Sequence, residues 1–238
     1  MGNCLSVTDP RGKTTTYAYD ALGRQVRAGS AVLNSFLQMP FCCGIMEKMP
    51  WEEDMIYFIA DAHLGHEGII SYCHRPFASA EEQDALIIKN WRERVREEDD
   101  VYIIGDLMSV PPRGVEEYLR RLSGRLHLLI GNHEDDWYDD CYRHYFVEVA
   151  DALTVDFDGK ATYLCHYPTP DFVGDLHIYG HMHENYKDGD FRRLVAAGRF
   201  ALNAAVELNG YRPVTIEEMI ESNARFVASL RERGLLPE

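Results

Sequence analysis

Long apolar runs are missing from this chain of 238 residues. A membrane-spanning helix needs roughly 18 or more consecutive apolar residues, and no run in the chain reaches that length. The first residues also lack the basic segment followed by an apolar one that marks a secretory signal. We therefore expect no membrane partner and a cytoplasmic location.

Cysteine is scarce and irregularly spaced. No C-x-x-C pair occurs, which argues against a zinc ribbon, and a chain of this length does not need a disulfide scaffold. We expect all the thiols to be reduced, as in a cytoplasm. The six cysteines are Cys4, Cys42, Cys43, Cys73, Cys141 and Cys165.

Basic residues are in deficit, because 24 Lys and Arg stand against 39 Asp and Glu, for a formal net charge of −15. An acidic surface repels nucleic acid backbones, whose binding is largely electrostatic. A large nucleic acid is therefore a disfavoured partner but not an excluded one, since a local basic rim around a site could override the net charge. A small phosphorylated substrate, such as a nucleotide, fits this charge better.

Five short motifs carry most of the chemistry that is present. They supply carboxylates, imidazoles and one amide, a mixture that suits a pair of divalent transition metals. Each motif falls where an apolar run ends and a turn begins, which is where an α/β sheet presents side chains to a ligand. In order, the motifs are Asp61-Ala62-His63, Gly105-Asp106, Gly131-Asn132-His133-Glu134, His166 and Gly180-His181-Met182-His183.

Each motif alone has an ordinary structural explanation. A D-x-H triplet can be a turn aspartate beside a surface histidine, and Gly-Asp is common in turns. A single histidine such as His166 is usually a satisfied core or surface residue. The conjunction of five motifs in order, each at a predicted strand end, favours a metal site over these alternatives.

The motifs resemble the signature of the calcineurin-like metallophosphoesterases, which reads D-x-H, G-D, G-N-H-[DE], H and G-H-x-H. The surrounding sequence resembles a small bacterial and phage branch of that family, for example at residues 58–66, 75–77 and 209–214. The resemblance runs from about Met55 to about Met219. It implies an α/β fold, a four-layer α/β/β/α sandwich of two mixed sheets with metals at the sheet ends.

The resemblance also implies how the ligands divide between two metal ions. Asp61, His63 and His183 would hold the first metal, and Asn132, His166 and His181 the second. Asp106 would bridge both, since a carboxylate offers two oxygens to cations roughly 3.5–4 Å apart. We expect divalent Mn, Fe, Zn or Ni, with manganese favoured.

His133 has a separate role in this resemblance, in which it faces the oxygen that leaves the phosphate. A protonated imidazole there could donate a proton to the leaving group. The alternative is that His133 only orients a metal ligand.

The chain departs from the family pattern after Gly105-Asp106. The serine/threonine phosphatases extend this motif to G-D-x-V-D-R-G, whereas here it reads Gly105-Asp106-Leu107-Met108-Ser109-Val110-Pro111. The second aspartate and the arginine are missing, which argues against a protein phosphatase. The change also removes the usual acidic partner of His133, for which Glu134 or Asp135 could substitute.

Two further residues are candidates for contact with the substrate phosphate, His66 and Arg75. Arginine binds phosphate oxygens with two parallel hydrogen bonds. The alternative for both residues is a surface salt bridge or the anchoring of a loop.

The expected function is hydrolysis of a phosphomonoester or phosphodiester by direct attack of a hydroxide shared by the two metals. One alternative is a non-catalytic binding module on the same fold, although a scaffold has no need of seven metal ligands. Another is a toxin cargo attached to a Rhs-type protein.

The toxin alternative arises from the first fifty residues, because residues from about 8 to 28 resemble a single Rhs or YD repeat. Such repeats build large β-shells, and one unit cannot bury its own apolar face. We expect residues 1–50 to be a vestigial or poorly ordered leader, in a β-hairpin or loose coil. Residues 51–238 would form the metallophosphoesterase domain.

Alternating strands and helices are expected in this second region, which favours a parallel sheet. Ser79 and Thr215 each precede a glutamate by three residues or fewer and mark helix starts. A third helix is expected at 114–122 and a tight hairpin at 152–165. The other expected strands are 54–60, 101–104, 126–130, 176–179 and 200–208.

Overall fold

The computed structural model describes residues 4–8, 14–19, 25–30, 54–109 and 114–237. The chain divides into two compact units, Met1–Pro50 and Trp51–Glu238. The first contains an antiparallel sheet in which β2 is central, so the expected hairpin gains a third strand. Its strands are β1 (Cys4–Thr8), β2 (Thr14–Tyr19) and β3 (Gln25–Ser30). That this unit is a vestigial leader stays a prediction.

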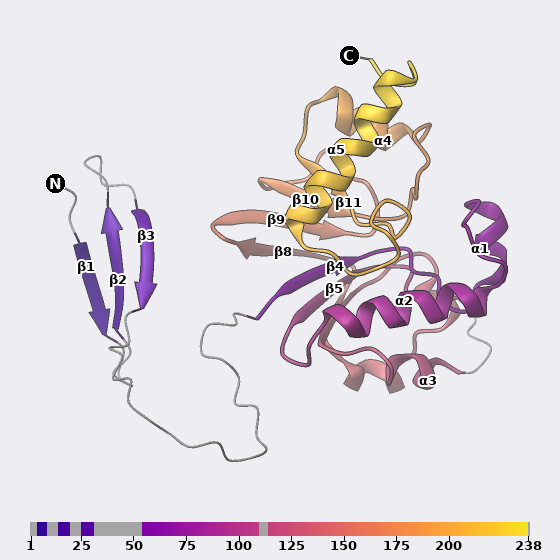
Figure 1. Ribbon diagram of the computed structural model, residues 1–238, viewed down its shortest axis with the longest axis horizontal. Helices are drawn as coiled ribbons and strands as arrows, with labels where there is room; N and C mark the ends of the chain where they lie inside the picture. The colour runs from indigo at the N-terminus through magenta and orange to yellow at the C-terminus, as the bar shows by residue number, and fades with distance from the viewer. Residues whose placement is uncertain (1–3, 9–13, 20–24, 31–53, 110–113, 238) are drawn as a thin grey trace, which may run out of the picture. The chain divides into compact units, whose positions relative to one another are not determined.

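The second unit contains two four-stranded sheets (Figure 1). The first sheet has the order β4-β5-β6-β7, and every neighbouring pair is parallel. Its strands are β4 (Ile56–Ile59), β5 (Asp100–Ile104), β6 (Arg125–Leu129) and β7 (Phe146–Ala150). The sequence did not predict β7, because this edge strand leaves Val147 and Glu148 exposed and shows little apolar alternation.

The second sheet has the order β11-β10-β9-β8. Its β8 and β9 form the expected antiparallel hairpin, whereas β10 is parallel to both of its neighbours. The mixed character expected for both sheets therefore belongs to this sheet alone. Its strands are β8 (Ala152–Phe157), β9 (Lys160–Cys165), β10 (Leu176–Tyr179) and β11 (Ala201–Asn203).

Strand β11 is shorter than the strand predicted at 200–208. The side chain of Asn203 accepts a hydrogen bond from the backbone N–H of Ala205, which turns the chain out of the sheet. Ala205 then forms an isolated parallel bridge with Ala60, beyond the end of β4. The segment after β11 thereby ties the second sheet to the edge of the first.

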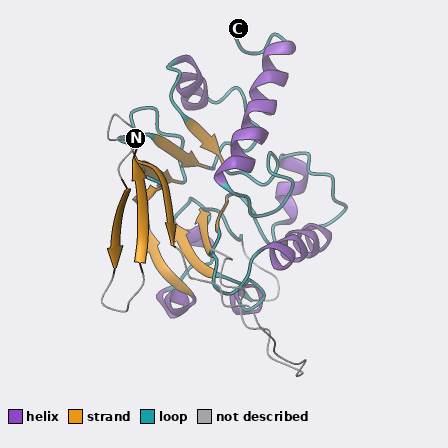
Figure 2. Cartoon of the chain, turned by 60° about the vertical axis from the view of Figure 1, so that its left-hand side comes forward, coloured by secondary structure: helices purple, strands orange, loops and turns teal. Residues whose placement is uncertain are grey.

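Helices cover the outer face of each sheet (Figures 1 and 2). Over the first sheet lie α2 (Ala80–Arg94) and α3 (Val115–Leu119), and over the second lie α4 (Gly189–Ala196) and α5 (Ile216–Glu232). A short helix, α1 (Glu67–Tyr72), follows β4. Neither α1 nor α4 was predicted. No helix in the described ranges is long and apolar enough to cross a membrane.

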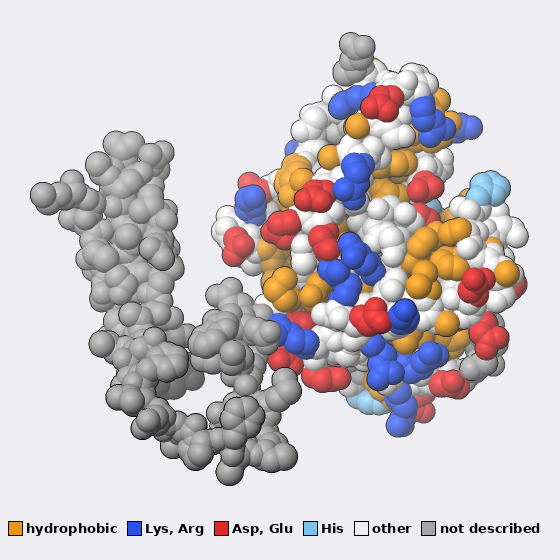
Figure 3. Space-filling view, in the orientation of Figure 1, with side chains coloured by type: hydrophobic (Ala, Val, Ile, Leu, Met, Phe, Trp, Pro, Cys, Tyr) orange, Lys and Arg blue, Asp and Glu red, His pale blue; other side chains and the backbone are white. Residues whose placement is uncertain are grey.

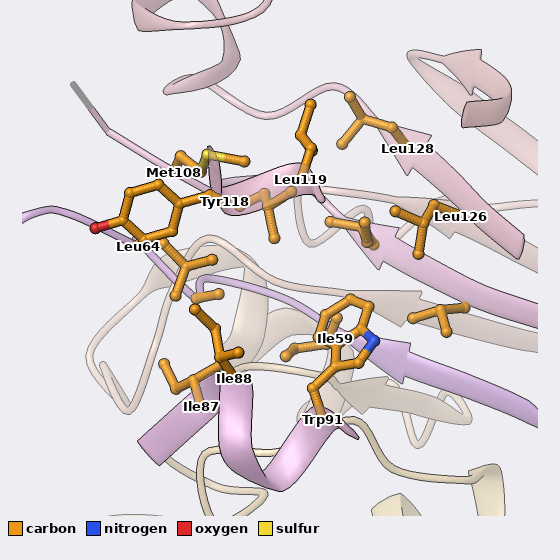
Figure 4. Packing of buried hydrophobic residues seen from close by; sticks show 14 of the residues in the cluster. Ile59, Leu64, Ile87, Ile88, Trp91, Met108, Tyr118, Leu119, Leu126 and Leu128 are labelled. Carbon is orange, nitrogen blue, oxygen red and sulfur yellow. The ribbon is translucent and has the colours of Figure 1, made fainter. Parts of the chain in front are cut away.

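The layers are held together by strands whose alternate side chains face two different cores. Tyr57 and Ile59 of β4 pack toward α2, whereas Phe58 packs toward the second sheet. Ile87, Ile88 and Trp91 of α2 face Ile59 (Figure 4), and each such burial contributes about 1.5–3 kcal/mol. A third cluster packs α4 and α5 on the second sheet. The four-layer α/β/β/α sandwich is therefore confirmed.

The predicted helix starts are also confirmed. The Ser79 side chain accepts a hydrogen bond from the backbone N–H of Glu82 at the start of α2. At the start of α5, Thr215 and Glu218 form a reciprocal capping box. These bonds satisfy N–H groups that have no partner within a helix.

Candidate active site

The site residues predicted from the five motifs all follow the carboxyl ends of strands in the second unit. In an α/β sheet these ends form the edge at which ligands bind. Asp61 and His63 follow β4, Asp106 follows β5, Asn132 and His133 follow β6, His166 follows β9, and His181 and His183 follow β10.

Two groups of side chains converge there. The ligand atoms of Asp61, His63 and His183 lie within 4.8 Å of one another, and those of Asp106, His166 and His181 do likewise. Oδ2 of Asp106 lies between the groups, 3.5 Å from Nε2 of His63 and 3.4 Å from Nε2 of His166. This is the position expected of a carboxylate that bridges two ions.

Asn132 completes the second group. Its Oδ1 lies 3.2 Å from Nε2 of His166 and 2.9 Å from Nδ1 of His181. The structure thus brings together all seven of the predicted metal ligands, although they come from five separate loops.

The surroundings of the His63 ring indicate whether the seven residues fit a metal ion. The residue is 1% exposed, yet neither Nδ1 nor Nε2 has a hydrogen-bond partner among the described residues. A buried polar group without a partner costs about 1–3 kcal/mol. A cation that accepts the imidazole lone pair would remove this cost, and imidazole with carboxylate is a donor set that divalent transition metals favour. The residues therefore fit such ions.

Five of the seven predicted metal ligands adopt a left-handed backbone conformation. A positive φ is uncommon outside glycine and costs of order 1–3 kcal/mol where the surroundings impose it. The backbone N–H of Asp61 donates to the carbonyl of Gly105, and that of His63 to the carbonyl of Asp106, so neighbouring loops hold these conformations. The φ values are 55° for Asp61, 48° for His63, 55° for Asp106, 69° for His181 and 50° for His183.

The glycines of the motifs leave room for the ligands. A Cβ on Gly105 would clash with the ring of His166, and one on Gly131 would clash with Oδ1 of Asp106. These positions thus require glycine because of close approach.

Burial and charge set the protonation of the two central residues. Burial alone would raise the pKa of Asp106, but the hydrogen bond and charge of His166 hold it well below its usual value. Burial lowers the pKa of His63 well below its usual value. Asp106 is therefore a carboxylate and His63 a neutral imidazole, the forms in which both bind metals.

Two of the candidate ligand histidines, His166 and His183, are oriented by partners on one ring nitrogen. Nδ1 of His166 donates to the carbonyl oxygen of Ile104 at 2.8 Å, which leaves Nε2 for the site. Nδ1 of His183 lies 2.9 Å from Oε1 of Glu207. Such partners fix the ring and the tautomer of a metal-binding histidine.

Sequence reasoning missed Glu207. It follows β11 and the buried residues Ala204, Ala205 and Val206, and it belongs to no motif. An acidic residue directly after a buried apolar run is the signal that could have found it.

Arg75 lies behind Glu207 rather than in the site. It is 5% exposed, and Nε and Nη2 donate to Oε1 of Glu207 at 2.9 and 2.6 Å. The remaining N–H groups donate to the carbonyls of Asp61 and Ala62 and to Oε1 of Gln83. All five donors are engaged, so the structure gives Arg75 the loop-anchoring role and leaves it no N–H for a phosphate.

His66 lies beside the candidate site. The centre of its ring is 5.4 Å from that of His63 and 5.7 Å from that of His133. Contact between His66 and a substrate phosphate stays a prediction.

His133 has an acidic partner that neither Glu134 nor Asp135 provides. Its Nδ1 lies 2.9 Å from Oδ2 of Asp136, and its backbone N–H donates to Oδ1 of Asp106. Residues three apart lie above one another in a 3-10 turn, which is the conformation of Glu134–Asp136. The acidic partner of His133 is therefore Asp136, and neither of the two residues that the sequence offered for this role.

Glu134 has a structural role instead. Its buried carboxylate accepts hydrogen bonds from the backbone N–H groups of Asp106, Leu107 and Gly131, at 2.9, 3.0 and 2.6 Å. It thus holds two of the motif loops against each other.

A cavity of about 970 Å³ opens over both ligand groups. One wall comes from α1 and the residues after it, including Ile69, Tyr72 and Cys73. Met182 and Tyr186 form part of the opposite wall. The volume is at the upper end of the roughly 300–1,000 Å³ typical of small-molecule sites.

Comparison with known proteins finds relatives of similar sequence and fold. A protein of unknown function from Aquifex aeolicus has a similar crystal structure, with a TM-score of 0.58 and 28% identity over 71% of this chain and 99% of that one. An uncharacterized protein of Methanocaldococcus jannaschii is 33% identical over 172 residues, which cover 70% of this chain and 89% of that protein. The gene 66 protein of Mycobacterium phage L5 is 35% identical over 82 residues, which cover 33% of this chain and 39% of that protein.

Two family models also match. The RHS repeat matches residues 2–31, and the calcineurin-like phosphoesterase matches residues 55–171, a range that contains the first four of the five motifs. With this match and its archaeal relative, the chain belongs to the calcineurin-like phosphoesterase family.

Proposed function

We propose that this chain hydrolyses a phosphomonoester or phosphodiester with two divalent metal ions. Membership of the family indicates a phosphoester hydrolase that uses divalent metal. The observation that carries the two-ion proposal is the convergence of seven ligand side chains around Asp106, with the buried ring of His63 lacking any other partner.

The residues divide as the resemblance implied. Asp61, His63 and His183 would hold one ion, Asn132, His166 and His181 the other, and Asp106 both. When bound, two divalent ions supply Lewis acidity toward phosphate oxygens and lower the pKa of water. Manganese is our preferred ion, and zinc, iron and nickel suit the same donors.

His133 is the proposed proton donor to the leaving oxygen. It lines the cavity, and its side chain is 30% exposed. Because Asp136 lies at hydrogen-bond distance from Nδ1, Nε2 is the nitrogen that remains for the leaving group.

The proposed substrate is a small phosphate ester such as a nucleotide. The cavity has room beyond one phosphate, and Ile69, Tyr72 and Met182 give it apolar walls for a leaving group. The face of the larger unit in Figure 3 mixes Lys and Arg with Asp and Glu and shows no continuous basic surface. The net charge of −15 supports a small substrate over a long nucleic acid.

The test begins with protein stripped of metal and reloaded with Mn²⁺. We expect hydrolysis of bis-p-nitrophenyl phosphate or p-nitrophenyl phosphate that depends on about two bound ions per chain. Asp106→Asn should lose most turnover, whereas Asp135→Asn, a matched loss of charge outside the ligand set, should retain it. If Asp106→Asn stays fully active, the proposal is wrong.

The RHS repeat match supports a second candidate context, in which this enzyme is the toxin cargo of a Rhs-type protein rather than a cytoplasmic enzyme. The genomic sequence upstream decides between them. A continuous array of further repeats would favour the cargo, and a stop codon or a ribosome-binding site just before Met46 or Met55 would exclude it.

A further inference from the structure

A further group of side chains that could hold a metal ion adjoins the site. The ligand atoms of Cys73, His183 and Glu207 lie within 4.8 Å of one another. His183 is shared with the first proposed metal, but Cys73 and Glu207 belong to neither ligand set. All three line the cavity that holds the proposed site.

The two oxygens of Glu207 are used very unequally. Oε1 accepts from Nε and Nη2 of Arg75 and lies 2.9 Å from Nδ1 of His183. Oε2 is buried and has no hydrogen-bond partner among the described residues, in a side chain that is 4% exposed. A buried carboxylate oxygen without a partner is costly, and a bound cation would remove that cost.

Cys73 determines which cation fits. It is a free cysteine directly after α1, and its side chain interacts with the ring of His183. Thiolate is a soft ligand that selects zinc-like ions over Mn²⁺ or Mg²⁺. A cysteine, a histidine and a carboxylate with one open position match a four-coordinate zinc site.

We propose that Cys73, His183 and Glu207 bind a thiophilic divalent cation such as Zn²⁺ or Cd²⁺, and that this ion inhibits the enzyme. The ion is held by Sγ of Cys73, Oε2 of Glu207 and Nδ1 of His183, with its fourth position open to the cavity. The thiol proton and the Nδ1 proton of His183 leave to solvent when it binds.

Inhibition follows from the position of His183. Binding of the ion breaks the hydrogen bond between His183 and Glu207 that orients the ring toward Asp61 and His63. Loss of such an orienting bond typically weakens metal binding by about 10–100-fold. This consequence rests on the proposed function, whereas binding of the thiophilic ion does not.

Binding is tested with Cd²⁺ on the full-length chain, by the ultraviolet charge-transfer band of cadmium thiolate. The matched variants are Cys73→Ser and Cys141→Ser, the second of which changes an exposed cysteine outside the cavity. We expect the cadmium thiolate band of the wild type and of Cys141→Ser to appear at the lowest Cd²⁺ concentrations. Cys73→Ser should show no band at those concentrations. The same band in Cys73→Ser would overturn the proposal, whether or not the protein is an active esterase.

Inhibition is tested with Zn²⁺ on the Mn²⁺-loaded protein, each variant being compared with its own zinc-free rate. We expect Cys73→Ser to need at least about tenfold more zinc for half inhibition than wild type or Cys141→Ser. Equal inhibition of all three would show that zinc acts by replacing manganese at the seven ligands, and the inhibitory role would be wrong.

Discussion

Oδ2 of Asp136 lies 2.9 Å from Nδ1 of His133 and 3.4 Å from Oγ of Ser109. Ser109 occupies the position at which G-D-x-V-D-R-G has its second aspartate. The acidic partner of His133 is therefore Asp136, in a different loop from the motif aspartate. Ser109, at the position of the motif aspartate, contacts Asp136. The chain retains the pairing of histidine with carboxylate although the motif that normally supplies it is absent.

The role of Asp136 can be measured by comparing kcat on substrates with different leaving groups. Asp136→Asn should reduce kcat by about tenfold or more for a diester with a poor alkyl leaving group, and less for p-nitrophenolate, which departs without a proton. KM should change little, because Asp136 is expected to touch His133 and not the substrate. Asp135→Asn is the matched control, and an equal loss on both substrates would contradict the positioning role.

His133 itself can be distinguished from a metal ligand. The ligand atoms of His133, His63 and Asp106 lie within 4.8 Å of one another. The geometry therefore permits His133 to be either a metal ligand or a proton donor. We expect His133→Ala to keep its manganese, as measured by elemental analysis, and to lose about 10²–10⁴-fold in rate. Loss of one equivalent of metal would instead make His133 a ligand.

Metal removal should lower the stability of the fold as well as the activity. Chelation leaves the buried ring of His63 without a partner, so Tm should fall and recover with added Mn²⁺. At a free ion concentration about 1,000 times Kd the gain is about 4 kcal/mol. His63→Ala should show a much smaller recovery, and His144→Ala, which changes an exposed histidine outside the site, should behave as wild type.

The anchoring role of Arg75 predicts a large loss of stability in Arg75→Lys. A lysine ammonium cannot reproduce the five donors that hold Glu207, Gln83 and two carbonyls together. Breaking such a buried network costs about 3–5 kcal/mol, measurable by urea unfolding. Arg120→Lys, in an exposed pair with Glu116, is the control and should cost far less. Similar losses in both variants would refute the assignment.

Asp99 predicts a pH dependence of stability that does not involve the metal site. Its side chain is fully buried and accepts hydrogen bonds from the backbone N–H groups of Met55 and Arg96 and from the Arg96 guanidinium. Burial alone would raise the pKa of Asp99, but the bonds from Arg96 and Met55 hold it below the ordinary 3.8.

Because the folded pKa of Asp99 is depressed, its contribution is fully present above the ordinary pKa and is lost as pH falls through the folded value. Asp99→Asn should therefore be less stable than wild type at neutral pH, with a difference that shrinks in acid. Urea unfolding at a series of pH values measures this, and a difference independent of pH would refute it.

The convergence of the seven candidate ligands could be predicted because two local signals coincide. Apolar runs end before Asp61, Asp106 and His166, and each motif begins there, so strand ends and ligands are read from the same short stretch. Parallel pairing then gathers the stretches after β4, β5 and β6 at one end of the first sheet, and those after β9 and β10 at one end of the second. Nothing in this argument required knowledge of which strands are neighbours.

Glu207, Asp136 and Arg75 could not be placed in the same way. Glu207 acts because β11 ends early and turns toward β4, and Asp136 acts because a 3-10 turn aligns it, rather than Asp135, with His133. The burial of Arg75 depends on contacts from loops far apart in the sequence. Roles of this kind follow from the packing of distant segments, which local patterns do not contain.

The left-handed backbone at five residues affects how a more thermostable variant of this protein could be selected. These residues are Asp61, His63, Asp106, His181 and His183. Glycine at any of these positions would relax the local conformation, so a screen for heat resistance in the absence of metal is expected to favour variants that have lost a predicted ligand. Selection would have to demand turnover and thermal tolerance together.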